Sequence, residues 1–524
     1  QWQYELAAGK IHEAKGDLEK AVVSYKQACE TLKGIKAKMA NEAMLKTFSD
    51  QERPADVYKR IIALLLKLGR TEEAFAYTEE SKSKIVQDAF AGLRPDDAGA
   101  ELKQTLLAVD QAQAKKEALE SELQSEKQKP EDRRDAKKVE ILTRTLAGTE
   151  GEFNQWMLKL KFQNRKMYDA LSIKPATLGD VQGQVPAGAV FLEYFIAPEE
   201  IYVFCIGRDF FLARSAAVPE KDLETLISRY VRLCMEPPSG PPDERMLAQG
   251  RKLYQILVAP VEDVVAKYET VVVIPFGALY YLPFHALVAN ASGPPEYLIE
   301  RKRICYTTSA TFADILKNEA RGHGTFMGFG NPDGSLPAAA AELGTLRDKI
   351  FKSGAKVFTA GAATKAAFFE QAKNADILHL ATHGFLDEAD PLASYLQFAG
   401  PSKEAQELTL SQIASYTALR ERNSLVFLSA CQTAREEGAA GSGSELITLA
   451  EAFAMAGAPT LVATLWKVED RATRLLAETF YDQLANKGRD KLEALRAGEI
   501  GLIRSAEFAH PFYWASFLLI GSWR

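Results

Sequence analysis

The chain has 524 residues, of which 47% are hydrophobic and 26% charged, the proportions of an ordinary globular protein. Its net charge of −6 and pI near 5.8 give no general attraction to nucleic acid, and it has neither an apolar run of about eighteen residues nor an N-terminal signal peptide. We therefore expect a cytoplasmic protein of several domains, without a direct nucleic-acid or membrane partner. The sequence opens at Gln1 without an initiator Met, and we expect it to be a fragment of something longer.

The cysteines are scattered without paired spacing, which argues against a disulfide framework or a zinc site. We expect no metal and no cofactor. The five cysteines are Cys29, Cys205, Cys234, Cys305 and Cys431.

Residues 1–100 contain two copies of the pattern Gly-x-x-Glu-x-Ala, beginning at Gly16 and Gly69, each between two amphipathic helices. Small Ala21 allows close helix packing, with Tyr25 filling the gap. This resembles a tetratricopeptide array, although the copies lie 53 residues apart rather than about 34, so the helices are longer or carry an insertion. Such repeats predict either a docking surface for a protein regulator or substrate, or a scaffold that only packs against the rest of the chain.

Residues 101–173 are charged and helical. Apolar side chains recur at three- and four-residue steps, or their multiples, from Leu102 to Leu160, and Pro130 interrupts the pattern. This predicts two long helices folded back on one another, a helical hairpin. The runs of Lys and Glu are interpreted as solvated faces.

Residues 174–320 form a predicted α/β unit whose strand ends carry no cysteine–histidine pair. His285 has no thiol or carboxylate partner in its own motif and is interpreted as a packing residue. The segment 221–234 is a predicted helix. The predicted strands are 190–195, 201–206, 210–214, 270–274 and 304–307.

Residues 321–524 form a second predicted α/β unit. We expect one helix to begin at Glu342 and another to be capped by Thr364. Helices between parallel strands require right-handed crossovers and cover both faces of the sheet. The predicted strands are 326–330, 357–359, 377–382, 425–430 and 460–465.

Two of these strands end in a reactive side chain beside small residues, one at His383-Gly384 and the other at Cys431. If the strands are neighbours, both groups face one crevice, where the imidazole takes the thiol proton and leaves a good nucleophile. The backbone N–H groups of Gly384 and Cys431 would then form an oxyanion hole. From the residues alone, an inert core cysteine and histidine are an equal alternative.

The strings around His383 and Cys431 resemble the CHAT-domain peptidases, caspase-like cysteine peptidases of clan CD that occur beside tetratricopeptide repeats. The resemblance implies a multidomain chain whose helical repeats and hairpin precede a duplicated caspase-like α/β fold, with an inactive half at 174–320 and an active half at 321–524. The likeness covers roughly 174–524 and continues at 274–279, 282–287, 463–470, 480–481, 510–517 and 520–523.

The resemblance also implies a function. We expect a cysteine endopeptidase that cleaves a protein substrate, with Cys431 as the nucleophile and His383 as the base and then the acid. In relatives of this fold the histidine can act without a buried carboxylate, so the sequence names no third residue. By analogy, relatives suggest bacterial defence or regulated self-killing, with a partner on the helical repeats regulating proteolysis.

We expect the strand 460–465 to lie beside the strand that ends at Cys431, and a substrate pocket is therefore expected beside the nucleophile. Trp466, Glu469 and Asp470 follow the strand 460–465 and would bring an aromatic wall and two carboxylates, which favours Arg or Lys before the scissile bond. Lys467 would weaken this preference by neutralising one carboxylate. Alternatively, both acids belong to the first turn of the next helix.

Two further alternatives concern function. A non-catalytic interaction or scaffold protein would use its repeats and a pseudo-peptidase domain to bind a regulator. A thiol redox switch is disfavoured because Cys431 has no resolving cysteine in its motif. The segment 435–444 lacks apolar anchors, which indicates either a gate that orders on substrate binding or a simple connector.

Overall fold

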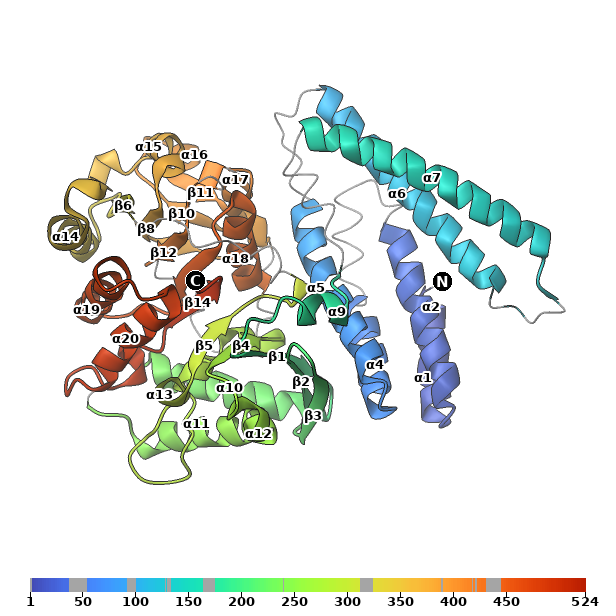
Figure 1. The fold of residues 1–524 in the computed structure, drawn as a ribbon, viewed down its shortest axis with the longest axis horizontal. Helices are drawn as coiled ribbons and strands as arrows, with labels where there is room; N and C mark the ends of the chain where they lie inside the picture. Colours follow the sequence, from blue (N-terminus) through green and yellow to red (C-terminus); the bar gives the residue numbers. More distant parts are fainter. Residues whose placement is uncertain are drawn as a thin grey trace. The chain divides into compact units, whose positions relative to one another are not determined.

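The computed structural model divides into two compact units, Gln1–Pro175 and Ala176–Arg524 (Figure 1). Cys431 and nearly all of the expected gate lie outside the described residues. The structure describes residues 2–36, 54–91, 100–127, 129, 133–163, 175–238, 240–311, 324–387, 390–416, 418–419, 422–429 and 444–524.

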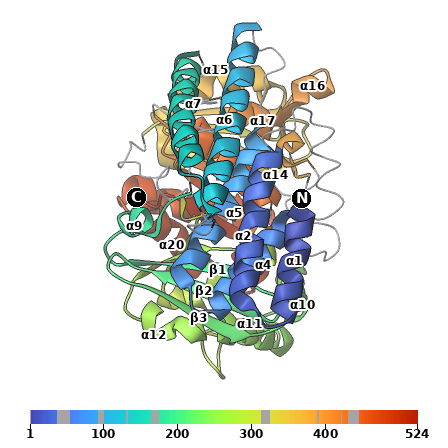
Figure 2. The same cartoon turned by 90° about the vertical axis from the view of Figure 1, so that its right-hand side faces the viewer.

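The described part of the first unit is helical, and Figure 2 shows its helices facing the viewer. Gly16 and Gly69 lie between consecutive helices with φ of 80° and 72°, a left-handed conformation that glycine adopts without steric cost. The two predicted helix–turn–helix units are therefore confirmed. The helices are α1 (Trp2–Ala14), α2 (Leu18–Lys36), α4 (Pro54–Lys67), α5 (Thr71–Ala91), α6 (Ala100–Lys127) and α7 (Ala136–Gln163).

The first helix pair packs through a glycine and a tyrosine. A Cβ atom on Gly9 of α1 would lie 2.3 Å from the ring of Tyr25 on α2, so the ring occupies the space that a side chain would take. The Tyr25 hydroxyl donates to Glu13 Oε2 at 2.6 Å. Tyr25 therefore fills the gap between the helices, as the sequence predicted.

Helices α6 and α7 form the predicted hairpin. Their contact surface is an apolar cluster of Leu106, Val109, Met157 and Leu160, on which partly buried Leu102 packs. This is the face that the three- and four-residue spacing indicated.

The second unit is built on one mixed sheet of eleven strands, in the order β3-β2-β1-β4-β5-β14-β13-β12-β8-β6-β7. All ten strands predicted from the sequence are present. The strands are β1 (Ala189–Ile196), β2 (Glu200–Ile206), β3 (Phe211–Ala217), β4 (Thr270–Ile274), β5 (Arg303–Tyr306), β6 (Phe326–Gly330), β7 (Ala355–Thr359), β8 (Ile377–Ala381), β12 (Leu425–Leu428), β13 (Thr460–Thr464) and β14 (Phe517–Gly521). A small second sheet contains β9 (Gly384–Phe385), β10 (Tyr395–Gln397) and β11 (Glu407–Thr409).

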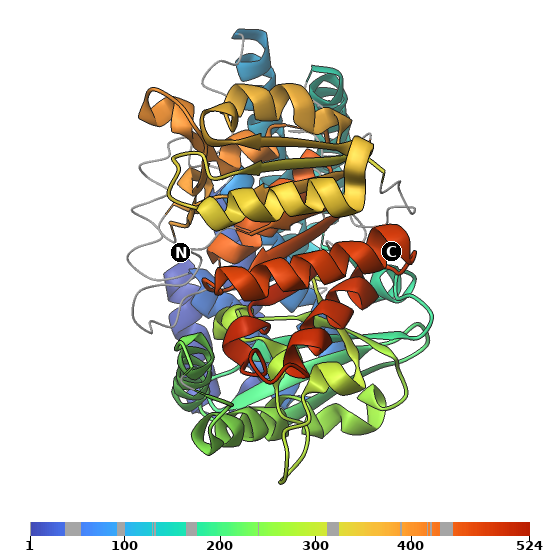
Figure 3. The same cartoon turned by 90° about the vertical axis from the view of Figure 1, so that its left-hand side faces the viewer.

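Helices cover both faces of the large sheet. Figures 1 and 3 show α14, α19 and α20 on one face and α18 on the other. The helices are α9 (Leu178–Gln182), α10 (Glu220–Met235), α11 (Glu244–Leu257), α12 (Glu262–Val265), α13 (Leu298–Arg301), α14 (Pro337–Thr345), α15 (Lys365–Gln371), α16 (Lys403–Gln406), α17 (Leu410–Ala414), α18 (Ser444–Ala456), α19 (Asp470–Tyr481) and α20 (Lys491–Ile503). Within the described residues, no helix combines the length and apolarity needed to span a bilayer.

The strands of the two expected halves belong to the same sheet. Strand β5 of the first half pairs in parallel with β14 of the second, through the register pair Tyr306 and Ile520. The two halves therefore share a seam inside one sheet. The finer division at residues 100, 173 and 320 stays a prediction.

One predicted boundary is wrong. The helix expected to begin at Glu342 begins at Pro337, where a proline is favoured because its missing N–H would be unpaired in the first turn anyway. Glu342 consequently lies inside α14 and is buried. Its burial requires a partner, which the sequence did not reveal.

Candidate active site

The strands that precede the two predicted catalytic residues are neighbours. β8 and β12 run in parallel with Leu380 opposite Leu428, and the Ser429 N–H donates to the Leu380 carbonyl at 2.9 Å. His383 follows Leu380 by three residues, and Cys431 follows Leu428 by three residues. The chain therefore leaves the sheet at the same edge after both strands. This is what the prediction requires if His383 and Cys431 are to face one crevice.

His383 lies beside a turn that the sequence analysis did not connect with it. Its Nε2 atom is 2.7 Å from Ser335 Oγ and 3.7 Å from Asp333 Oδ2, and its side chain is 24% exposed. The ring is thus held on one edge and partly open to solvent. Among the described residues, no group bonds its Nδ1 atom.

The hydrogen bonds around Ser335 fix where the proton of His383 lies. Partial burial alone would raise the pKa of Asp333, but two hydrogen bonds from Ser335 and the nearby His383 outweigh it and hold that pKa below its usual value. Asp333 is therefore a carboxylate, and the Ser335 hydroxyl donates its only proton to Oδ1 at 2.7 Å. Ser335 Oγ then accepts from His383, so in the neutral form of the ring the proton is on Nε2 and Nδ1 keeps a lone pair.

The turn is anchored to the histidine strand by its backbone. Asn331 adopts a left-handed conformation with φ of 49°, and its N–H donates to the Ala381 carbonyl at 3.1 Å. Its side-chain oxygen accepts from the Leu336 N–H at 2.7 Å and closes the turn. A Cβ atom on Gly330 would lie 2.8 Å from the same Ala381 carbonyl, so the close approach requires glycine.

The sequence contained one signal for this contact. Asn331-Pro332-Asp333-Gly334 is a strong turn pattern, and it places Asp and Ser side chains at the carboxyl end of a strand next to β8. Asp333 and Ser335 could therefore have been predicted as neighbours of His383, because the carboxyl ends of neighbouring parallel strands lie at the same edge of a sheet.

Gly384 presents a backbone N–H that its strand partner does not use. The His383 carbonyl accepts from the Gln397 N–H at 2.8 Å, which makes the next pair, Gly384 and Leu396, a non-hydrogen-bonded pair of the β9–β10 ladder. The Gly384 N–H therefore points away from β10. Its role as an oxyanion donor stays a prediction.

The predicted substrate-pocket residues lie at the end of β13, which neighbours β12 as expected. Trp466 is 2% exposed, and its Nε1–H donates to the Phe512 carbonyl at 3.1 Å, so most of its ring packs inside the unit. Glu469 and Asp470 are exposed at the start of α19. This is the position that the helix-turn alternative expected, and a pocket role stays a prediction.

The remaining cysteines are poor nucleophiles. Cys29, Cys205, Cys234 and Cys305 are all buried. Burial raises the pKa of Cys205 and of Cys234 to about 12, because the interior disfavours a thiolate. Cys431 lies outside the described residues.

Two other histidines form buried clusters with a tyrosine and a glutamate. His379 on β8 contacts Glu342 of α14 at 3.0 Å and the Tyr481 hydroxyl at 2.9 Å. His285 contacts the Tyr306 hydroxyl at 3.0 Å and Glu499 at 3.5 Å. His285 is thus buried, as its interpretation as a packing residue requires, and α20 supplies the carboxylate that its own motif lacks.

Comparison with known proteins places this site in a family. The CHAT domain profile matches residues 247–522, which is more than half of the chain. Tetratricopeptide repeat protein 28 of Mus musculus and that of Homo sapiens are each 26% identical to it, over 52% of this chain and 13% of theirs. The chain therefore spans about an eighth of the length of these relatives.

Two solved structures were also matched. The Saccharomyces cerevisiae separase–securin complex gives a TM-score of 0.45 at 9% identity, covering 99% of this chain and 46% of the other. The Arg-specific cysteine proteinase gingipain R gives a TM-score of 0.33 at 10% identity, covering 58% of this chain and 74% of the other.

Proposed function

The chain belongs to the CHAT-domain family, as the strings around His383 and Cys431 predicted, and from this premise we propose that it is a cysteine endopeptidase. Cys431 is the nucleophile and His383 the base. The observation that carries the proposal is the position of His383, which follows β8 beside the strand that leads to Cys431 and is held by Ser335 at Nε2.

The reaction follows from these groups. Nδ1 of His383 takes the thiol proton, and the sulfur of Cys431 attacks the carbonyl carbon of the scissile peptide bond. The N–H groups of Gly384 and Cys431 bind the oxyanion. His383 then returns the proton to the leaving amine as the C–N bond breaks, and water attacks the thioester by the same route to release the acid.

Ser335 and Asp333 support this cycle without touching the substrate. They keep the proton of neutral His383 on Nε2, so that Nδ1 is the basic atom. When Nδ1 takes up the thiol proton, the ring becomes a cation whose Nε2–H still faces Ser335, with the Asp333 carboxylate 3.7 Å away. This charge stabilises the imidazolium that every turnover passes through.

The substrate is proposed to carry a basic residue before the cut, selected by Glu469 and Asp470. Both carboxylates are exposed, so water screens them, and we expect a preference for Arg over a neutral residue of no more than about tenfold. The double variant Glu469→Gln with Asp470→Asn should remove it in a peptide-library digest. If the preference for Arg is unchanged in the double variant, residues other than Glu469 and Asp470 are responsible for it.

A protein regulator bound to the helical repeats is the corresponding proposal for the first unit. Its support is the pair of helix–turn–helix units and the tetratricopeptide repeat proteins among the relatives. Binding partners that protect α1, α2, α4 and α5 from hydrogen exchange and change the cleavage rate would support it.

The direct test is cleavage of a peptide library followed by mass spectrometry. Cys431→Ala should abolish cleavage, because no other side chain replaces the thiolate. Cys234→Ala is the matched control, since that thiol is buried in α10, and it should retain cleavage. Cleavage that persists in Cys431→Ala would overturn the proposed function.

A further inference from the structure

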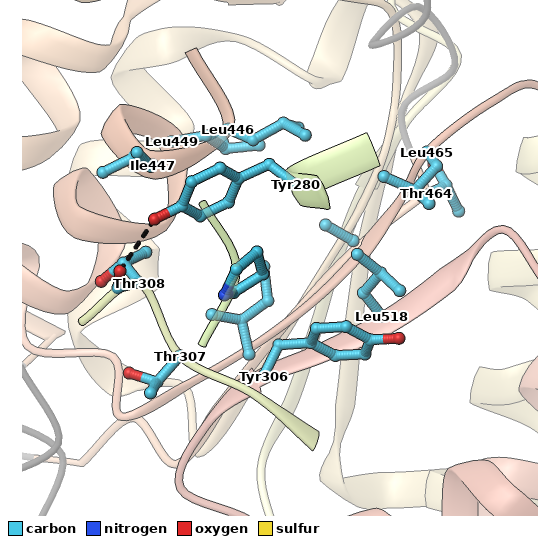
Figure 4. Close-up of a pocket in the computed structure, with 13 residues that line it drawn as sticks. Tyr280, Tyr306, Thr307, Thr308, Leu446, Ile447, Leu449, Thr464, Leu465 and Leu518 are labelled. Atoms are coloured by element: carbon cyan, nitrogen blue, oxygen red, sulfur yellow. Dashed lines mark hydrogen bonds between the residues drawn. The ribbon is translucent and has the colours of Figure 1, made fainter. Parts of the chain in front are cut away.

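The interior of the second unit has little room for a ligand at the seam between β5 and β14. Figure 4 shows the cavity there, with Leu446 of α18 on one side and Leu518 of β14 on another. Tyr280 also lines it, and its hydroxyl donates to the Thr308 carbonyl at 2.9 Å. The remaining space is about 30 Å³, enough for one or two water molecules. A substrate side chain is therefore excluded from this cavity, and its contacts with the protein must form elsewhere.

His383 leads directly into the small sheet, whose two faces differ. The buried face carries the register partners Gly384, Leu396 and Leu408. Side chains alternate between the faces of a strand, so Phe385 lies on the opposite face, which is also the face of His383 two residues before it. The Gln397 N–H donates to the His383 carbonyl at 2.8 Å, so the pairing of β9 with β10 extends back to His383. The open face of the small sheet therefore continues the surface that carries His383.

A stacked aromatic pair stands on this open face. Phe385 and Tyr395 are register partners across β9 and β10, and their ring centroids lie 4.8 Å apart with the ring planes inclined by 24°. β9 is the outer strand of the small sheet, so no strand of the described chain pairs with it on the side away from Tyr395. Phe385 is 37% exposed. The aromatic shelf, as we call Phe385 and Tyr395, is thus covered on one side and open on the other.

Tyr395 is held at its polar end. Burial raises the pKa of Tyr395, and the neighbouring Glu407 carboxylate raises it further. The hydroxyl is therefore neutral at pH 7 and donates to Glu407. Lys403 lies 3.7 Å from the same carboxylate and balances its charge. The aromatic shelf therefore offers a fixed apolar surface, and the carboxylate beside it is already paired.

The chemistry of His383 indicates which side of the scissile bond faces the aromatic shelf. This step rests on the proposed function, in which Nδ1 of His383 gives its proton to the leaving amine, so the scissile nitrogen lies beside the imidazole ring. Side chains two residues apart in a strand are separated by about 7 Å. A large side chain on the residue that contains the scissile nitrogen spans such a distance. The aromatic shelf therefore lies on the leaving-group side of the cut.

We propose that Phe385 and Tyr395 bind an aromatic or large aliphatic side chain of the substrate residue that directly follows the cleaved bond. A substrate ring stacks on the open side of Phe385, because aromatic rings pair favourably at centroid separations of about 4.5–7 Å. The basic residue that Glu469 and Asp470 are proposed to select lies before the cut. The two preferences therefore concern different residues of the substrate and are tested separately.

The test uses two peptides, acetyl-Ala-Arg-Phe-Gly-amide and acetyl-Ala-Arg-Ala-Gly-amide, which differ only in the residue after the expected cut. Their binding is measured by ligand-observed NMR titration on the full chain with Cys431→Ala, which cannot cleave them, and their kcat/KM on the wild type. In both measurements the phenylalanine peptide should be favoured about threefold to tenfold, the usual worth of an aromatic pair. Phe385→Ala should bring this ratio close to one.

Two control variants accompany Phe385→Ala. Phe385→Tyr keeps the ring and should retain the preference for the phenylalanine peptide. Leu475→Ala, on a side chain of α19 that is 38% exposed, is the matched control and should also retain it. If Phe385→Ala does not fold, Phe385→Thr replaces it, since threonine is favoured in strands and also removes the ring.

The two measurements separate this inference from the proposed function. Cleavage of both peptides with equal kcat/KM and equal affinity would overturn the aromatic shelf and leave the peptidase standing. A binding preference that depends on Phe385, without cleavage by the wild type, would support the aromatic shelf and contradict the peptidase. A phenylalanine preference retained in Phe385→Ala, or no saturable binding of either peptide, would also overturn the inference.

Discussion

His383 is hydrogen-bonded to Ser335 and lies 3.7 Å from Asp333, two residues that precede it by about fifty positions. The first prediction follows from this contact. Ser335→Ala removes the acceptor on Nε2, so part of the neutral histidine should carry its proton on Nδ1, where it cannot act as a base. We expect kcat to fall roughly tenfold to a hundredfold while KM stays within a factor of about two.

Conservative and remote variants separate positioning from folding. Ser335→Thr keeps the hydroxyl and should recover most of the lost kcat. Ser292→Ala, in an exposed loop, should behave like the wild type. If kcat falls equally in Ser335→Ala and Ser335→Thr, or if KM rises while kcat is unchanged, the hydroxyl does not position His383.

At this scale the sequence predicted that His383 lies at the end of a buried strand, but not its contacts with Ser335 and Asp333. The histidine was recognisable because it ends a buried strand beside glycine. Ser335 and Asp333 were not, because their contact depends on how the turn after β6 lies against β8. Glu342 was misplaced for a similar reason: the proline that starts its helix was overlooked, and its buried partner His379 lies on another element.

Among the elements, the turns between helices give the sharpest stability prediction. Gly16 has a φ of 80° and open space around it, so Gly16→Ala should cost about 1 kcal/mol through backbone strain alone. Gly148 lies inside α7, also in open space, and Gly148→Ala should stabilise the same unit by roughly 0.5–1 kcal/mol. Urea unfolding followed by circular dichroism measures both. If both substitutions stabilised the unit, or both destabilised it, the turn assignment would be contradicted.

The buried cluster of His285 gives a pH dependence at the level of elements, because it ties the short helix at Phe284–Ala286 to β5 and α20. Burial lowers the pKa of His285 to about 3, and burial likewise raises the pKa of Glu499 well above its usual value. His285 is thus neutral at pH 7 in the folded protein. Between pH 6.5 and 3 the unfolded chain binds a proton on His285 that the folded protein does not, so the contribution of His285 to stability falls as the pH is lowered, whereas the raised pKa of Glu499 acts in the opposite direction.

We expect His285→Gln to remove this loss of unfolding free energy at low pH, which amounts to at most about 5 kcal/mol. The variant should be less stable than the wild type at pH 7, because it loses the imidazole bond to Tyr306, and the difference should shrink as the pH falls from 6.5. Thermal unfolding at several pH values measures this. Parallel curves for the two proteins would show that His285 does not titrate on unfolding.

For the whole molecule, the shared sheet predicts that the two expected halves of the second unit, 174–320 and 321–524, unfold together. Leu495 is buried in α20, and Leu495→Ala should cost about 2–5 kcal/mol. Hydrogen exchange should then speed up by the same factor in β1 of the first half and in β6 of the second. Faster exchange confined to one half would mean that the seam between β5 and β14 does not couple them.

The strand order itself was beyond sequence reasoning. Ten of the eleven strands of the large sheet were recognisable in the sequence, β14 was not predicted as a strand, and β12 was expected beside β13. The joining of β5 to β14 was not, because it pairs residues more than 200 positions apart through a single register pair. Hydrophobic runs specify that strands are buried, whereas the order depends on how the covering helices pack.

The central claim is that Cys431 is a nucleophile activated by His383, and labelling with an electrophilic peptide tests it most directly. Mass spectrometry of the digested protein should find the adduct on Cys431 alone. His383→Ala should slow labelling by about a hundredfold or more, the usual worth of a general base. The absence of an adduct, or labelling of Cys431 at the same rate with and without His383, would contradict the account.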